Sequence, residues 1–485
     1  MSKEQDPLQP EAIGAKEPSL FTPEPYVERQ EERLITEKVD ASQKGGMTKP
    51  VVEFYSGVPG IGKTWFLEEI KTQYALREDS NLPKPPITAF VDLETVNQGP
   101  LVLQKLVRQM NSQLPESEEI PDLSGLDKDK AAQLVVDRLS ALSEKHLPIL
   151  LFDNLTSISK EFGYWFEEKI VCPLAITDRV LFVFSGDSWR EWGKFGVRQR
   201  LEPVELSVFD REQTYRQLER LYGKVSDQER KAVFRFTEGL PFANREVMEL
   251  LRENAGQVDK RFGESVYEDI IKRKLLAEIP EDLKPILMVA ATLRKFNPTS
   301  LRRFSVAFLE SEYKEKPEGF YPDAIRDMQE TKLVWWSSAD GGYILHPVVR
   351  KILDRNLQVR EPDEFGRRHS EAARLYQEWL GKYPRNGIGF LFELMFHQAQ
   401  ALNVQGRPQD ELVGVFANNL KVLKEHPETR WNLPEMAEEL TKGLDRDREL
   451  LIETFDPVVA KDFRKIAAQF VKEIKQFFYT RFLDE

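Results

Sequence analysis

The 485-residue sequence predicts an α/β domain, with a mostly parallel sheet covered by helices on both faces, followed by a long helical region. Two patterns predict this fold. Between residues 51 and 209, short apolar runs alternate with segments of helical periodicity, as in sheets whose strands are joined by helices. After Asp210 the pattern becomes almost wholly helical. We therefore expect several domains, of which only the first is built on a parallel sheet.

The composition is that of a globular protein. Charged residues make up 31% of the chain and hydrophobic residues 41%. The formal net charge of −12 argues against a general nucleic-acid binder. A single cysteine, Cys172, excludes a disulfide framework or a cysteine zinc site within one chain. No apolar run is long enough to span a membrane and the N-terminal segment does not resemble a signal peptide, so we expect a cytoplasmic protein with no membrane partner.

The segment before the first strand is predicted to hold a tail and a short helix. Residues 1–25 are rich in Pro, Glu and Gln and poor in large apolar side chains, which is typical of a disordered tail. Residues 26–50 are expected to form an N-terminal helix over 26–41, followed by a Gly-containing linker. The sheet domain is then predicted over residues 51–209.

The strands of the sheet domain are identified by their apolar runs. The runs PILLFDN and VLFVFSGD both end in polar residues, among them Asp153 and Ser185. Because ligands bind at the carboxyl ends of the strands in such sheets, these side chains are candidates for a site. The predicted strands lie at 51–56, 87–94, 148–154, 180–187 and 201–209, and the main helices between them at 65–76, 99–114 and 130–144.

The first predicted strand leads into a glycine-rich sequence that matches G-x-x-x-x-G-K-[ST]. Its glycines let backbone N–H groups turn toward a polyphosphate, and the following helix directs the positive end of its dipole to the same place. Lys63 is expected to reach the β- and γ-phosphates and the Thr64 hydroxyl to hold Mg²⁺. An ordinary glycine-rich turn is the alternative, which the flanking strand and helix disfavour. The residues predicted to surround the nucleotide here are Gly57, Val58, Pro59, Gly60, Ile61, Gly62, Lys63, Thr64 and Trp65.

Asp153 and Asn154 end a predicted buried strand. A buried carboxylate needs a cation or a hydrogen-bond partner, and a Mg²⁺ held jointly by Asp153 and Thr64 meets that need. Capping of the next helix is the alternative role for Asp153. Many P-loop ATPases place an acid at or near position 154, whereas an amide can hold a water but is a poor proton acceptor. We therefore predict slow hydrolysis, with Lys63, Thr64, Asp153 and Asn154 as catalytic residues, unless Glu94 supplies the carboxylate.

Three further regions are predicted from residue 210 onward. Residues 210–278 are expected to form a helical lid domain, interrupted by the sequence GLPFA at 239–243. Residues 279–360 are expected to form a winged-helix domain. Residues 361–485 form a helical C-terminal domain that begins with a linker at 361–365 and has no clean repeat. The elements expected in the winged helix are helices at 281–294, 298–307, 321–331 and 347–357 and a hairpin at 333–346 that turns at Gly341 and Gly342.

The order of the motifs along the chain is itself informative. The glycine-rich loop is followed in turn by LLFDN, LEPVELSVFDREQ, GLPFA and YILHPVVRKIL. In this order the chain resembles a STAND-class P-loop ATPase of the NB-ARC-like group, a relative of the AAA+ proteins. The resemblance covers residues 26–357 and, more weakly, 366–404. Members of this group are switch modules of plant resistance proteins, apoptosome scaffolds and bacterial signalling or antiphage proteins, which implies ATP or ADP and Mg²⁺ as cofactors.

The resemblance assigns four more residues to the nucleotide. Val27 and Arg29, in YVERQEE, would line the adenine pocket, with a charged helix facing solvent as the alternative. Pro241 would pack on the adenine or ribose from the lid, a role compatible with its also being the first residue of a helix. His346 would touch the β-phosphate of bound ADP and lock the closed state, unless it merely ends the hairpin strand.

The chain departs from this group at the γ-phosphate sensor. Gly186 stands where the group usually leads to an arginine that senses the γ-phosphate. Arg190 is close enough in sequence to replace it, and Arg198 and Arg200 could act as fingers in trans in an oligomer. A surface arginine is the alternative for each of them. These departures concern hydrolysis and output, not nucleotide binding.

Two functions remain open from the sequence. The first is an ATP/ADP-operated switch with slow hydrolysis, whose helical C-terminal domain binds a protein partner or a second copy of the chain. The alternative is an AAA+ initiator-like ATPase that binds DNA through its winged helix. The expected recognition helix at 321–332 carries three acidic residues against two basic ones, so DNA is the disfavoured partner. A stand-alone enzyme that modifies a small substrate has no second catalytic constellation to support it.

Overall fold

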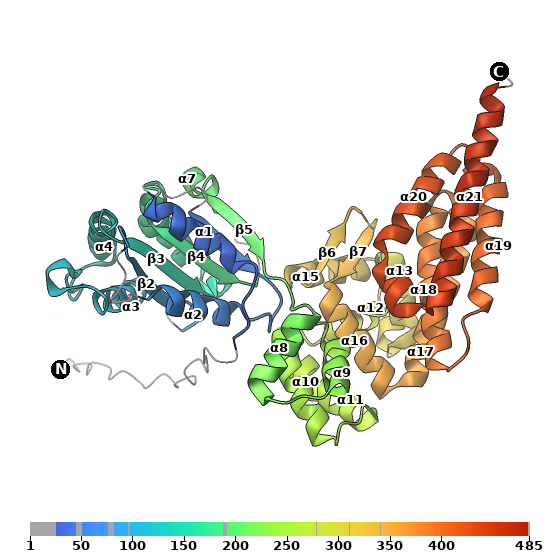
Figure 1. Cartoon of the computed structure of the whole chain (residues 1–485), viewed down its shortest axis with the longest axis horizontal. Coiled ribbons are helices and arrows are strands. Elements are labelled where there is room, and N and C mark those ends of the chain that lie inside the picture. Colours follow the sequence, from blue (N-terminus) through green and yellow to red (C-terminus); the bar gives the residue numbers. More distant parts are fainter. Residues whose placement is uncertain are drawn as a thin grey trace, which may run out of the picture. The chain divides into compact units, whose positions relative to one another are not determined.

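A computed structural model describes residues 26–44, 51–75, 82–95, 98–187, 192–277, 279–309, 311–339 and 341–483 (Figure 1). The tail predicted at 1–25 and most of the linker before the first strand lie outside the described residues. The chain divides into two compact units, Met1–Val225 and Ser226–Glu485. None of the helices in the described residues combines the length and the apolar character that a membrane crossing requires.

The first unit is built on a five-stranded sheet in which every pairing is parallel. The strand order is β2-β3-β4-β1-β5, so β1 lies between β4 and β5. Strands β3 and β4 are buried along their whole length, which explains their continuous apolar sequences. This arrangement confirms the predicted α/β fold class. The strands are β1 (Val52–Ser56), β2 (Pro86–Asp92), β3 (Leu147–Asp153), β4 (Leu181–Gly186) and β5 (Leu201–Glu205).

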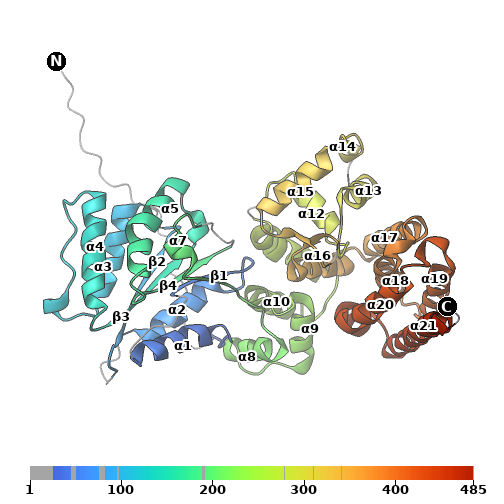
Figure 2. The ribbon, with the colours of Figure 1, turned by 90° about the horizontal axis from the view of Figure 1, so that it is seen from above.

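Helices cover both faces of this sheet. Figure 2 shows α1 and α2 on one side of the sheet and α3, α4 and α5 on the other. The helix predicted at 26–41 begins only at Glu32, because the residues before it take an irregular path. The helices of the first unit are α1 (Glu32–Gln43), α2 (Lys63–Tyr74), α3 (Gly99–Asn111), α4 (Lys128–Leu142), α5 (Lys160–Phe166), its π-helical continuation η3 (Glu167–Val171), α6 (Cys172–Ala175), α7 (Phe195–Arg198) and α8 (Arg211–Tyr222), with short 3₁₀ turns η1 (Glu116–Glu118) and η2 (Leu155–Ser157).

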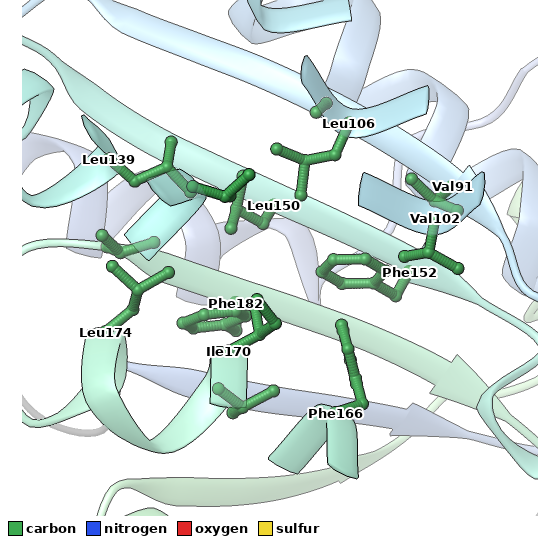
Figure 3. Close-up of a cluster of buried hydrophobic side chains, with 14 of the residues drawn as sticks. Val91, Val102, Leu106, Leu139, Leu150, Phe152, Phe166, Ile170, Leu174 and Phe182 are labelled. Atoms are coloured by element: carbon green, nitrogen blue, oxygen red, sulfur yellow. The ribbon is translucent and has the colours of Figure 1, made fainter. Parts of the chain in front are cut away.

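A hydrophobic core fills the space between the sheet and the α3, α4 and α5 side (Figure 3). Phe152 of β3 lies at its centre and meets the ring of Phe166 edge-on, with ring centroids 5.0 Å apart. Leu150 and Phe182, from neighbouring strands, point into the same cluster (Figure 3). This packing holds the strands in register, and therefore fixes where their polar carboxyl ends lie.

Helix α1 is attached to the other side of the sheet by a buried ion pair. Lys38 of α1 donates to Glu53, a fully buried residue of the interior strand β1, and lies 3.1 Å from Glu202 of the edge strand β5. Burial raises the pKa of Glu53, while Lys38 opposes the shift. Tyr55 donates a second hydrogen bond to the same carboxylate. A buried charge of this kind is tolerated because its partners are supplied by neighbouring elements.

The second unit is predominantly helical. Its one sheet in the described residues is the antiparallel hairpin of β6 (Val334–Ser337) and β7 (Gly342–Leu345), which Phe296 extends through a bridge to Tyr343. The helices around the hairpin are α12 (Lys284–Ala290), α13 (Pro298–Phe308), α14 (Ser311–Lys314), α15 (Phe320–Glu330) and α16 (Pro347–Arg360). The other helical elements are α9 (Asp227–Thr237), α10 (Pro241–Glu253), α11 (Lys260–Val266), η4 (Tyr267–Leu275), α17 (Pro362–Lys382), η5 (Pro384–Asn386), α18 (Gly387–Val404), α19 (Glu411–Glu425), η6 (Pro427–Thr429), α20 (Leu433–Arg446), η7 (Glu449–Thr454) and α21 (Pro457–Leu483).

The linker predicted at 361–365 is wrong. Helix α16 ends at Arg360 and α17 already begins at Pro362, which leaves only Glu361 between them. Proline is well tolerated at the first position of a helix, and Asp363 and Glu364 in the first turn interact favourably with its dipole. The acidic, Pro-containing sequence is thus a helix start and not a flexible connection.

Buried ion pairs join the hairpin region to the C-terminal helices within the second unit. Arg294, which follows α12, donates to Glu393 of α18 and to Asp447 after α20, at 2.7–3.1 Å. Burial would lower the pKa of Arg294, but the two carboxylates raise it. Arg350 of α16 pairs with Glu449 of η7. The helices after residue 361 are therefore held to the preceding region by charges that would be costly to separate.

Candidate phosphate-binding site

The glycine-rich sequence forms the loop between β1 and α2. Gly57, Gly60 and Gly62 have φ angles of 155°, 82° and 95°, a region of backbone conformation that favours glycine. A Cβ atom at Gly57 would come within 3.1 Å of the Ile61 side chain. Val58 and Ile61 are buried, whereas Pro59 and Gly60 are partly exposed. The loop is thus folded so that α2 starts at Lys63, with its N-terminus at the carboxyl edge of the sheet.

Lys63 lies over this loop. Its Nζ donates to the carbonyl oxygens of Gly57, at 2.8 Å, and Val58, at 3.4 Å. The same atom is 2.6 Å from the Asp187 carboxylate. The ammonium group therefore sits at the mouth of the loop, between its first residues and the end of β4.

Thr64 and Asp153 are 89 residues apart in sequence but share a hydrogen bond. Thr64 Oγ1 donates to Asp153 Oδ2 at 2.5 Å, and Ser185 at the end of β4 donates to the other carboxylate oxygen. Burial raises the pKa of Asp153, whereas the hydrogen bonds from Ser185 and Thr64 lower it. The alternative role of Asp153 is to cap the next helix. Among the described residues, the one backbone N–H that donates to its side chain is that of Asn154, which precedes η2, so no hydrogen bond of the capping type is present.

Asn154 is held in a left-handed conformation, with φ 56° and ψ 41°, which asparagine tolerates better than most residues. Its side-chain amide donates to Asp92 Oδ1 at 2.9 Å. Asp92 ends β2 and pairs in register with Asp153 on β3. Glu94, which the sequence offered as an alternative carboxylate, is exposed, and its backbone N–H donates to Asp92. Asp92, and not Glu94, is therefore the carboxylate that accepts a hydrogen bond from the Asn154 side-chain amide.

Val27 and Arg29 precede α1 and are both buried, so the alternative of a solvent-facing segment is wrong for these two residues. The Arg29 guanidinium donates to the Ile61 carbonyl in the glycine-rich loop and, at 2.7 Å, to the Ser207 carbonyl after β5. It also lies over the Phe209 ring, 4.6 Å from the centroid. Arg29 thus ties the glycine-rich loop to the segment between β5 and α8, 178 residues away in sequence.

The other predicted residues are distributed over both units. Trp65 is a partly exposed residue of α2. Pro241 is the buried first residue of α10, which is the helical role that the sequence allowed. Arg198, at the end of α7, is exposed, and Arg200 forms an ion pair with Asp178 at 2.7 Å. Arg190 lies outside the described residues.

His346 connects β7 to α16 in the second unit. Its backbone N–H donates to the Leu333 carbonyl at 2.7 Å, and its ring meets Trp335 edge-on at 5.9 Å. Burial lowers the pKa of His346 to about 4. The imidazole is therefore neutral at pH 7 in this environment.

Sequence reasoning missed Asp92 and Asp187 as members of the site. The only signal for them is position: each lies at the carboxyl end of a strand that neighbours a strand already assigned to the site. The contact between Arg29 and Ser207 has no local signal at all. The parallel sheet, the glycine-rich loop between β1 and α2, and the carboxylate at the end of β3 together define the fold of a P-loop NTPase.

Comparison with known proteins gives the following. No family model matches the chain. A curated relative, the protein translocase subunit SecA of Nitratiruptor sp., is 21% identical over 267 residues, which cover 50% of this chain and 30% of that protein's length. Several solved structures resemble this chain at low sequence identity. The Walker-type ATPase of Pyrococcus abyssi is 14% identical, with 68% of this chain and 96% of that chain covered and a TM-score of 0.47. The ORC2 protein of Aeropyrum pernix in its ADP form is 17% identical, with 70% and 96% covered and a TM-score of 0.43. A STAND protein with a tetratricopeptide repeat sensor from Pyrococcus horikoshii is 14% identical, with 93% and 65% covered and a TM-score of 0.30.

Proposed function

We propose that the chain is an ATP/ADP-binding switch of the STAND type that hydrolyses ATP slowly. The observation that carries the proposal is the 2.5 Å hydrogen bond between Thr64 Oγ1 and Asp153 Oδ2, which joins the glycine-rich loop to the end of β3. A hydroxyl and a carboxylate are the hard oxygen donors that Mg²⁺ prefers, and Mg²⁺ usually takes few protein ligands beside substrate phosphates. Thr64 and Asp153 are therefore proposed to hold Mg²⁺, which when bound offsets negative charge on the β- and γ-phosphates.

The slow hydrolysis is proposed from the chemistry of Asn154. Its amide already donates to Asp92, which orients the side-chain carbonyl oxygen for accepting a hydrogen bond from water. An amide cannot take up the proton of that water, so Asn154 positions the nucleophile without activating it. Lys63 completes the set by binding phosphate oxygens through its ammonium group.

The switch itself is proposed from the resemblance together with the elements of the second unit. We interpret α8–η4 as the helical lid, and α12, α13, α15 and the β6–β7 hairpin as a winged helix. Pro241 and His346 are proposed to contact adenine or ribose and the β-phosphate of ADP in a closed state, with Val27 and Arg29 near the adenine. Such a switch requires a ligand that makes different contacts in two domain arrangements. A protein partner or second copy bound through the C-terminal helices, and a cytoplasmic location, complete the proposal.

The first test identifies the nucleotide that the full chain retains. Protein purified without added nucleotide is denatured, and the released small molecules are separated and quantified. We expect one ADP per chain, and loss of most of it in a His346→Ala variant that keeps the fold. A control variant, His426→Ala, changes a histidine of the C-terminal region that caps η6 and should retain the ADP. An empty wild-type site combined with rapid steady-state ATP hydrolysis would contradict the switch.

A second prediction concerns the protonation of His346. The pKa of His346 in the fold is about 4, below the ordinary value of 6.5. As the pH falls, the unfolded chain therefore takes up a proton on this ring at a higher pH than the folded chain does. The residue is therefore expected to destabilise the fold as the pH falls from 6.5 toward 4 and to have no such effect above 6.5. A phosphate placed against the ring would favour the charged form, so ADP should raise this pKa. NMR titration of the histidine rings with and without ADP, assigned with His346→Gln, measures the shift; an unchanged pKa would argue against the phosphate contact.

DNA binding as in an initiator ATPase remains the alternative proposal. The helix that would enter the groove, α15, carries Arg326 on its surface, but this side chain pairs with Asp323 at 2.9 Å. Exposed carboxylates on this helix would repel phosphate. We therefore propose a protein partner or a second copy of the chain in preference to DNA. The two proposals are separated by the nucleotide-release experiment, because a cycling machine would be purified without stoichiometric ADP.

A further inference from the structure

Among the residues that the structure describes, the ammonium group of Lys63 has three partners, as many as it has protons to donate. Two are the carbonyl oxygens of Gly57 and Val58, at 2.8 and 3.4 Å, which belong to the loop itself. The third is the carboxylate of Asp187, at 2.6 Å. A phosphate oxygen that binds Lys63 must therefore replace one of these partners or crowd against them.

Asp187 is the partner that stands at the surface. Its side chain is 44% exposed, whereas that of Lys63 is 9% exposed. The register of the sheet explains its position: Ser56 of β1 pairs with Gly186 of β4, so Gly57 and Asp187 leave the sheet side by side at the same edge. Asp187 thus places a negative charge where the loop opens, next to the one lysine that the motif supplies for phosphate.

We infer that Asp187 sets the preference between nucleotides by opposing the third phosphate. The lysine of a glycine-rich loop of this type reaches the β- and γ-phosphates. A γ-phosphate brings additional negative charge close to Lys63, and therefore close to Asp187, where like charges repel, although solvent at the exposed Asp187 side chain screens part of this repulsion. A diphosphate avoids much of this repulsion. Asp187 would then favour ADP, the ligand of the closed state; the inference rests on the proposed function and names the residue that biases it.

The test compares two nucleotides on three forms of the full chain. Calorimetric titration with Mg²⁺ gives the Kd of ADP and of the non-hydrolysable analogue AMP-PNP for wild type, Asp187→Asn and Asp187→Glu, after bound nucleotide has been removed. In Asp187→Asn we expect the ratio of the AMP-PNP Kd to the ADP Kd to fall by about tenfold, since one repulsive charge near the γ-phosphate is removed. Asp187→Glu keeps the charge and is expected to keep the wild-type ratio. High salt should reduce the difference between the variants.

Each other outcome has a distinct meaning. If Asp187→Asn weakens both nucleotides equally, Asp187 only positions Lys63 and the inference is wrong. If Asp187→Glu behaves like Asp187→Asn, the effect arises from packing and not from charge, which also overturns it. If wild type and variants bind neither nucleotide although they unfold cooperatively, the proposed function fails. If Asp187→Asn binds both nucleotides with the wild-type ratio of the two Kd values, the proposed function is unaffected and only the inference about Asp187 is wrong.

Discussion

Replacing Lys63 with alanine is expected to lower the affinity for ADP and ATP by about 100-fold, roughly 3 kcal/mol. The variant loses the one ammonium group that the glycine-rich loop offers to the phosphates, where the hydrogen bonds are charge-assisted. It also releases Asp187, which then stands at the loop with an uncompensated negative charge. Both changes act in the same direction. Equilibrium titration with a fluorescent nucleotide, at matched ionic strength, measures the loss.

The matched control for this experiment is Lys71→Ala. Lys71 lies on the same helix α2, two turns further on, and its 40% exposed side chain pairs at 3.1 Å with Glu68, which is 12% exposed. Because Lys71 lies two turns beyond the glycine-rich loop, its loss should leave the nucleotide affinity within about twofold of wild type. If Lys63→Ala bound nucleotide as tightly as Lys71→Ala, the loop would not be a phosphate site.

Replacing Arg29 with alanine is expected to lower the free energy of unfolding by about 3 kcal/mol, because two carbonyl groups, one of them buried, lose the charged donor that the buried guanidinium supplies. These carbonyls belong to Ile61 in the loop and Ser207 after β5. The loop then loses its tie to the segment before α8, so nucleotide affinity should also fall. Denaturant unfolding measures the loss of stability, and nucleotide titration of the folded variant without denaturant measures the loss of affinity.

Two further variants define what Arg29 does. Arg29→Lys keeps the charge, but a single ammonium cannot reproduce a planar fork that reaches two carbonyls, so it should recover only part of the stability. Arg33→Ala removes a nearby arginine whose side chain is 81% exposed and should change stability by less than about 0.5 kcal/mol. Wild-type stability and affinity in Arg29→Ala would show that the guanidinium does not support the loop.

The sheet and the glycine-rich loop could be predicted because their signals are local. A buried parallel strand such as β3 needs a continuous apolar run, and the loop needs glycine where φ is positive. The carboxyl ends of neighbouring strands meet at one edge, so the approach of Asp153 to Thr64 could also be expected. The helix start at Pro362 could not be distinguished from a linker, since a proline followed by acidic residues is compatible with both.

The remaining contacts could not be predicted because they depend on how distant segments fold together. Arg29 meets Ser207 only after α1 has packed beside β5, and nothing in either short sequence indicates the other. Asn154 turns toward Asp92 because its backbone is left-handed, which the sequence does not reveal. Asp187 reaches Lys63 only through the pairing of β1 with β4. Charge and residue type therefore identify candidate site residues, whereas the pairing of the strands determines which of those at the edge of the sheet lie together.

The shortest autonomous form of the first unit cannot begin at β1, the strand that leads into the motif. Glu53 is fully buried in β1, and the ammonium that neutralises it belongs to Lys38 of α1. A truncation to residue 51 would leave this carboxylate in the interior without its cation, a severe cost in free energy, and would also delete Arg29. Residues 26–43 are therefore an integral part of the phosphate-binding fold, although the motif lies entirely downstream of them.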